Sequence, residues 1–198
     1  MSTEENKTPG EEVEKQASPT PGKTVYTFAR PVVINGVQKN SVEYRALTVG
    51  DMRKVNKGKT SNQTVRMIAF ACGIAPTDVE EFKTRDFVAL RSLIVDDLEE
   101  GAEIDYEPDD NEEIPVELSS PIKTEEGKTI KSVIVVELTT KQSLKAEKIA
   151  KGDDFETVFH RVRESCGLSS ADLEKMTLED FNKVGAAVSV FFTQNGKN

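Results

Sequence analysis

The sequence is poor in the side chains that most often carry catalysis or bind metals. It has one histidine and two cysteines in 198 residues. Any mechanism built on imidazole would have to use His160, which we expect at the surface because it lies beside the apolar stripe of a predicted helix. Cys72 and Cys166 lie on the apolar faces of predicted helices, and this placement favours buried thiols over a disulfide or a metal site.

Signatures of nucleotide, nucleic-acid and membrane binding are also missing. Three Gly-Lys-Thr triplets lack the earlier glycine that a phosphate-binding loop requires. The formal net charge is −9 and no dominant basic cluster is present, so nucleic-acid binding is not expected. No apolar run is long enough to cross a membrane and no signal-peptide pattern is present, so we expect a soluble intracellular protein. The sequence predicts no catalytic residue, metal site or cofactor, and it does not indicate an enzyme.

Two segments lack the balance of side chains that a folded core needs. Residues 1–23 contain three prolines and almost no apolar residue, which predicts a disordered tail. Residues 96–115 carry eleven acidic side chains and no basic one. Their mutual repulsion favours an extended, solvated segment. We therefore expect the domain boundary at an acidic linker over residues 99–115.

The rest of the chain contains one unit used twice. Residues 72–87 and 166–181 align without a gap. Cys72, Gly73, Asp78, Glu80, Asp86 and Phe87 are identical to Cys166, Gly167, Asp172, Glu174, Asp180 and Phe181. Upstream, residues 31–48 match 121–139 with a one-residue difference between the proline and the glycine, where a hairpin loop tolerates insertion. A match of this density at a nearly constant offset indicates a duplication.

Each unit is predicted to be a β-hairpin followed by three or four short helices, so the fold class is α+β. Asn35-Gly36 between two β-prone runs is a strong hairpin signal. Thr48 and Thr139 begin a first helix with a variant of the capping box. We place the first unit at residues 24–98 and the second at residues 116–194.

The apolar spacing predicts further helices with one buried face each. The second helix of each unit ends at Gly73 or Gly167, where a left-handed residue is expected. A short third helix begins at Pro76 in the first unit and after Ser169 in the second. The predicted buried stripes are Val65, Ile68, Ala69 and Cys72 with Phe87, Leu90, Ile94 and Leu98 in the first unit, and Phe155, Val158, Phe159, Val162 and Cys166 with Phe181, Val184, Val188 and Phe192 in the second.

Each unit also carries an apolar patch that its twin replaces with charge. Met67 and Phe70 lie opposite the core stripe on the second helix of the first unit, and Val190 and Phe191 lie on the last helix of the second unit. The two patches either pack against each other or complete a core, or they form a surface for another chain. These four residues are the candidate partner-binding residues.

The order of these features is typical of a known family. The chain shows a proline, a hairpin glycine, a strand ending in Leu-Thr, a helix ending in Cys-Gly-Leu, then Ser-x-x-Asp-Leu-Glu-x-Met and a closing Asp-Phe helix. This order resembles the phage tail assembly chaperones, the E-type proteins and their Mu-like relatives encoded just before the tape-measure gene. The resemblance is clearest across residues 116–192 and looser across 24–95. Family members usually carry one such unit, so a tandem duplication is a departure.

The resemblance implies a non-enzymatic function. The protein would bind the tape-measure protein, keep it soluble, promote tail tube polymerisation around it and leave before the tail is complete. It would act in the host cell cytoplasm and be absent from the mature virion. The tail tube protein and a second copy of the chain are further candidate partners. The alternatives are a structural baseplate or tail-completion protein retained in the virion, a general protein–protein adaptor, and an enzyme.

Overall fold

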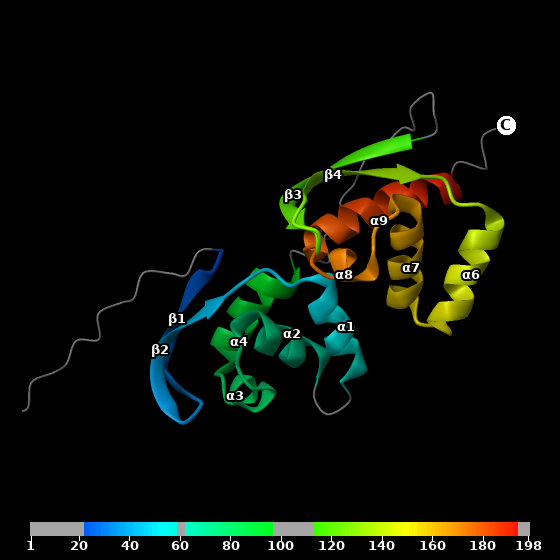
Figure 1. Cartoon of the computed structure of the whole chain (residues 1–198). Coiled ribbons are helices and arrows are strands. Elements are labelled where there is room, and N and C mark those ends of the chain that lie inside the picture. Colours follow the sequence, from blue (N-terminus) through cyan, green and yellow to red (C-terminus); the bar gives the residue numbers. More distant parts are fainter. Residues whose placement is uncertain (1–21, 59–61, 97–112, 194–198) are drawn as a thin grey trace, which may run out of the picture.

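The computed structural model of the chain describes residues 22–58, 62–96 and 113–193. Residues 1–21 of the expected tail and 97–112 of the expected acidic region lie outside these ranges. The described residues form two similar units, each a two-stranded antiparallel hairpin followed by helices (Figure 1). The predicted α+β class with two homologous units is therefore confirmed.

The elements follow one another in the same order in both units. The first unit comprises β1 (Thr24–Ile34), β2 (Val37–Tyr44), α1 (Val49–Lys57), α2 (Gln63–Cys72), α3 (Pro76–Glu80), α4 (Thr84–Arg91) and a π-helical turn, η1 (Ser92–Asp96). The second comprises β3 (Glu113–Lys123), β4 (Thr129–Val136), α6 (Thr140–Ala150), α7 (Asp154–Cys166), α8 (Ser170–Leu173) and α9 (Leu178–Thr193). Residues 113–115, expected at the end of the linker, instead begin β3, because Ile114 pairs with Val135 and is fully buried.

The two hairpins differ in their turns and share an irregularity. Asn35 and Gly36 both have positive φ, as the predicted two-residue turn requires. The second hairpin turns through residues 124–128, with Gly127 at positive φ. In both hairpins the pairing register shifts within the first strand, at the stretch that contains Pro31 or Pro121. A bulge is where a strand tolerates proline.

A buried aspartate at the start of the last helix binds this irregular stretch in each unit. Asp86 is 1% exposed, and its Oδ1 accepts hydrogen bonds from the Ala29 amide (3.0 Å) and the Tyr26 hydroxyl (2.9 Å). Asp180 is 0% exposed and accepts from the amides of Ser119 (2.7 Å) and Ser120 (2.9 Å). These bonds satisfy bulge amides that the strand ladder leaves unpaired.

The predicted helix ends are confirmed. Thr48 and Thr139 each form a capping box, with Asp51 and Gln142 respectively. Gly73 and Gly167 end α2 and α7 in the left-handed conformation. Pro76 lies in the first turn of α3, and Ser169 caps α8 through the amide of Asp172.

Two residues of the predicted buried stripes are exposed. Val158 is 37% exposed, at the edge of the contact between α7 and Gly185 of α9. Phe192 is 44% exposed in the last turn of α9, where the Arg161 guanidinium covers its ring at 4.8 Å from the centroid. Leu98 lies outside the described residues. The other predicted stripe residues are buried or half-buried.

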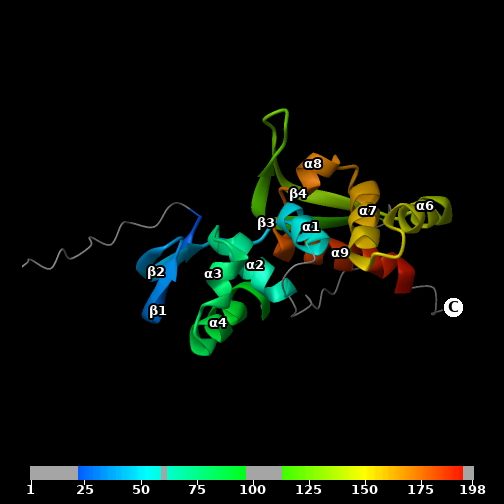
Figure 2. The same cartoon turned by 90° about the horizontal axis from the view of Figure 1, so that it is seen from below.

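The two units pack against each other through α1. Figures 1 and 2 both place α1 of the first unit beside α7 and α8 of the second. An isolated antiparallel bridge joins Thr48 to Thr177. The buried side chains of both units belong to one hydrophobic cluster, so the core is continuous across the junction.

Candidate partner-binding surface

The junction between the units is built first from backbone hydrogen bonds. The amides of Val49 and Gly50 donate to the carbonyl oxygens of Met176 (2.9 Å) and Glu174 (3.0 Å), and the Leu178 amide donates to the Leu47 carbonyl (2.9 Å). The approach is close, because a Cβ at Gly50 would lie 3.0 Å from the Glu174 carbonyl oxygen. The first turn of α1 therefore docks on the loop between α8 and α9.

Arg53 of α1 closes this junction with two carboxylates. Its Nε and Nη2 bind both oxygens of Glu156 at 2.7 and 2.9 Å, and its Nη1 binds Glu174. The guanidinium lies over the Phe159 ring, 4.2 Å from the centroid. The hydrogen bond with Glu156 raises the pKa of Arg53, so the side chain stays charged. A bidentate, partly buried pair of this kind fixes orientation as well as adding energy.

His160 lies beside this ion pair and not at the open surface, which differs from the sequence expectation. Its side chain is 11% exposed, and its Nε2 is 3.7 Å from a Glu156 oxygen. Burial lowers the pKa of His160, and the nearby Arg163 and Arg53 lower it further while Glu156 opposes them. The histidine is therefore neutral at pH 7.

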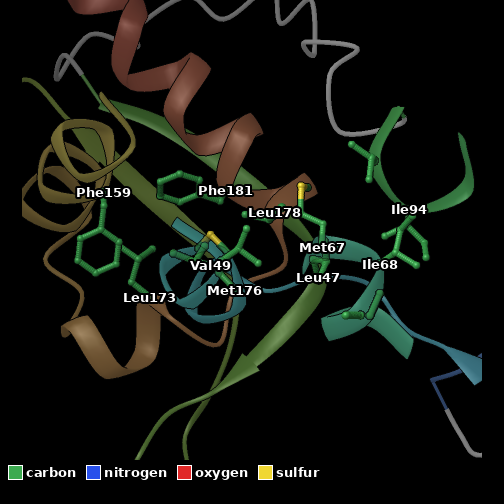
Figure 3. Close-up of a cluster of buried hydrophobic side chains, with 14 of the residues drawn as sticks. Leu47, Val49, Met67, Ile68, Ile94, Phe159, Leu173, Met176, Leu178 and Phe181 are labelled. Atoms are coloured by element: carbon green, nitrogen blue, oxygen red, sulfur yellow. The ribbon is translucent and has the colours of Figure 1, made fainter. Parts of the chain in front are cut away.

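Apolar side chains of both units fill the space behind the ion pair. Figure 3 shows Leu47 and Val49 of the first unit together with Phe159, Leu173 and Met176 of the second. All five are at most 2% exposed. Removing this surface from water stabilises the pairing of the units, at about 25 cal/mol per Å² of apolar area.

A groove of about 250 Å³ opens at the edge of the junction. Its lining comes from α1, α2, η1, α7 and α9 and comprises Met52, Gln63, Thr64, Met67, Val95, Phe155, Leu178 and Asn182. The two methionines are flexible and polarizable, so they can adapt to partners of different shape. Met67, one of the four candidate partner-binding residues, lines this groove.

The four candidate residues have different positions in the fold. Met67 is 7% exposed and belongs to the hydrophobic core. Helical spacing left open whether Met67 completes a core or faces another chain, and in the structure it is a core residue that also lines the groove. Phe70 is half-buried against the core, as are Val190 and Phe191 near the end of α9. The groove contacts the start of α9, so the two patches do not form one site.

The cysteines have the environment expected of buried thiols. Cys72 and Cys166 are both free, and burial raises the pKa of each thiol to about 12. They are therefore protonated and weakly nucleophilic at neutral pH. Among the described residues, no cluster of three or more His, Cys, Asp or Glu side chains is placed to hold a metal ion. Within residues 22–58, 62–96 and 113–193, no helix is both long and apolar enough to span a bilayer.

Sequence reasoning missed the residues that hold the units together. Arg53, Glu156 and Glu174 are far apart in the sequence, and no short motif links them. The buried aspartates could have been found from the sequence. Asp86 and Asp180 are identical at equivalent positions of the two units, although the helix faces around them differ.

A comparison with protein families gives one match. The family model described as "Phage tail assembly chaperone proteins, E, or 41 or 14" matches residues 25–96 and, separately, residues 115–193. The two regions together cover more than half of the chain, and each includes one hairpin with its helices. No curated protein and no solved structure gives a significant match.

Proposed function

Because the chain belongs to the phage tail assembly chaperone family, we propose that it binds the tape-measure protein of its phage. In this proposal the chain keeps that protein soluble and promotes polymerisation of the tail tube around it. The observation that carries the proposal is the family match over both units. The role is binding and release of a client, and it requires no catalytic step.

The chemistry of the surface supports a helical client. An amphipathic helix is recognised by an apolar groove that takes side chains at helical spacing. The groove at the junction offers Met52, Met67 and Phe155 for such contacts. The net charge of −9 would keep a complex with an apolar client dispersed.

The proposed contact surface includes Phe70, Val190 and Phe191 as well as the groove beside Met67. Phe70, Val190 and Phe191 are half-buried, so part of each side chain is open to a partner. We place the complex in the host cell cytoplasm during assembly, and we expect the chain to leave before the virion is complete. The tail tube protein is the second proposed partner.

The test is co-expression of the full chain with the long protein encoded next downstream, followed by measurement of the soluble fraction and of co-purification. The soluble fraction of the client should rise and the two proteins should elute together. A client that stays insoluble beside the folded chain contradicts the proposal. Mass spectrometry of purified particles adds a second readout, because abundant chain in finished virions would indicate a structural tail part.

Paired variants locate the contact. Val190→Ser with Phe191→Ser should reduce co-purification of the client, whereas Val33→Ser with Val37→Ser, an exposed pair on the first hairpin, should not. Thermal unfolding of each variant establishes that it is folded. Equal client binding by both double variants would remove Val190 and Phe191 from the contact surface.

A further inference from the structure

The groove beside Met67 is made by both units and depends on their docking. Three of its lining residues are buried: Met67 and Val95 come from the first unit, and Leu178 comes from the second. Figure 3 shows Met67 and Leu178 side by side at the junction. Phe155 of α7 forms a further part of the lining and packs on the Phe181 ring, with the two ring centroids 5.5 Å apart. The tandem arrangement therefore creates a concavity that neither unit contains alone.

The lining of this groove is electrically neutral. None of the described residues that form it carries a charge, although 31% of the residues in the chain are charged. A charged group inserted there would lose water without meeting a partner of opposite sign, and such burial is costly. The side chain that fits the groove is therefore an uncharged one.

The size and chemistry of the groove favour an aromatic side chain. Its volume is about 250 Å³, and an apolar cavity of about 150 Å³ is already large enough to bind benzene. Met52 and Met67 contribute thioether sulfurs, which make favourable contacts with aromatic rings. The Phe155 ring can pack edge-to-face against a second ring. Gln63 is exposed in the lining, where its amide oxygen can accept a hydrogen bond from an indole N–H.

We propose that the groove takes one aromatic side chain, with tryptophan the best fit, from a helix of the protein that the chain binds. The identity of that protein rests on the function proposed above, whereas the groove and the class of side chain it takes do not. A few well-packed aromatic residues commonly carry most of the free energy of an interface. An anchor seated here contacts both units at once, so client binding would also stabilise their docking.

The four methionines of the chain provide a direct readout. Met52 and Met67 line the groove, Met176 is fully buried in the core, and Met1 lies outside the described residues. We would label the methionine methyl groups of the full chain with ¹³C and titrate it with N-acetyltryptophanamide. The Met52 and Met67 signals should move upfield, because a methyl group over an aromatic face is shielded. The signals of Met1 and Met176 should stay in place.

Several outcomes of this titration overturn the proposal. Met52 and Met67 signals that stay fixed in a millimolar excess of N-acetyltryptophanamide show that the groove takes no aromatic ring. Equal shifts with N-acetylglutamate amide show that it does not select an uncharged side chain. An equal shift at Met176 shows that the probe enters the core and is not confined to the groove.

A tryptophan built into the groove tests the same fit without an added ligand. Thr64→Trp on α2 and Asn182→Trp on α9 each enlarge a lining residue, one from each unit, and the chain has no tryptophan of its own. Each ring should shift the Met52 and Met67 signals, emit at a shorter wavelength than an exposed indole, and abolish the response to N-acetyltryptophanamide. Gln38→Trp, at an exposed position of the first hairpin, is the matched control and should show none of these effects.

Co-purification with the long downstream protein separates this inference from the function it rests on. Thermal unfolding first establishes that each variant is folded, and Asn182→Trp replaces Thr64→Trp if the latter is not. The parent and Gln38→Trp should retain the client, whereas the filled groove should retain it about tenfold or more weakly. Equal retention by the parent and the filled groove would overturn the aromatic anchor and leave the proposed function standing. A parent that responds to N-acetyltryptophanamide but retains no client would instead overturn the tape-measure protein as the partner.

Discussion

The two units have the same elements in the same order, but their first helices have different surroundings. Helix α1 is buried on two sides, by α2 and by the second unit, whereas α6 packs on α7 through Ser143, Ala146 and Ala150 and exposes Leu144. The buried aspartates differ as well, because both oxygens of Asp180 accept hydrogen bonds while Oδ2 of Asp86 has none among the described residues. The units thus share their order of elements and differ in the packing of the first helix and in the hydrogen bonds of the buried aspartate.

The core aromatics should give the largest difference between the units. Phe181→Ala should cost about 3–5 kcal/mol of unfolding free energy, because the ring is 2% exposed. Phe159→Ala should cost a similar amount, since its ring is fully buried. Phe87→Ala, the counterpart of Phe181→Ala in the first unit, should cost clearly less because Phe87 is half-buried. Urea unfolding measures all three, and equal costs for Phe87 and Phe181 would contradict the difference in packing.

The two aspartates should respond differently to the same substitution. Asp180→Asn places an amide NH₂ against a backbone amide in either orientation, because Ser119 and Ser120 donate to separate oxygens. We expect a loss of about 2–3 kcal/mol. Asp86→Asn can turn its NH₂ toward the position of Oδ2 and keep the acceptor for Ala29, so its cost should be about 1 kcal/mol or less. Chemical denaturation measures the loss of unfolding free energy in both variants. A larger loss for Asp86→Asn than for Asp180→Asn would contradict this expectation.

Exchanging the equivalent residues Arg53 of α1 and Leu144 of α6 tests the junction. Arg53→Leu gives the first unit the residue found in the second, and it leaves Glu156 and Glu174 without their cation. The expected cost is about 1–3 kcal/mol, since hydrogen bonds to charged groups are stronger than neutral ones and these carboxylates are only partly exposed. The reverse change, Leu144→Arg, should be nearly neutral, because Leu144 is 59% exposed. A neutral Arg53→Leu would show that backbone pairing alone holds the units.

The close approach at Gly50 can be tested in the same way. Gly50→Ala puts a Cβ about 3.0 Å from the Glu174 carbonyl oxygen, and overpacking of this kind typically costs about 1 kcal/mol or more. Lys141→Ala, at the equivalent position of α6, should leave thermal stability unchanged. A rise in stability on Gly50→Ala, as expected of an unhindered helical glycine, would mean that the junction can widen.

The smallest effect concerns pH. The pKa of His160 in the fold lies below its ordinary value of 6.5 because of burial first and then the nearby arginines. The unfolded chain therefore binds a proton more readily, and stability should fall as the pH drops below about 6.5 toward the folded pKa. His160→Gln should flatten the stability curve in this window. A parent curve that is already flat there would show that the histidine gains a compensating partner on protonation.

Local features of the fold were predictable from the sequence, and contacts between the units were not. Asn35-Gly36, the capping threonines and the glycines that end α2 and α7 act through their immediate neighbours, so short patterns were sufficient to find them. Helical spacing placed Met67 opposite the core stripe of α2 and left open whether it completes a core or faces another chain. Met67 is 7% exposed and lines one groove with Phe155, Leu178 and Asn182 of the second unit, and no periodicity within one helix identifies those neighbours.

The covalent connection between the units changes how the junction responds to dilution. Segments on one chain meet at an effective concentration set by the connecting residues, which reaches the millimolar range for short links. The pairing held by Arg53 is therefore independent of how much protein is present, whereas a contact between separate copies disappears on dilution.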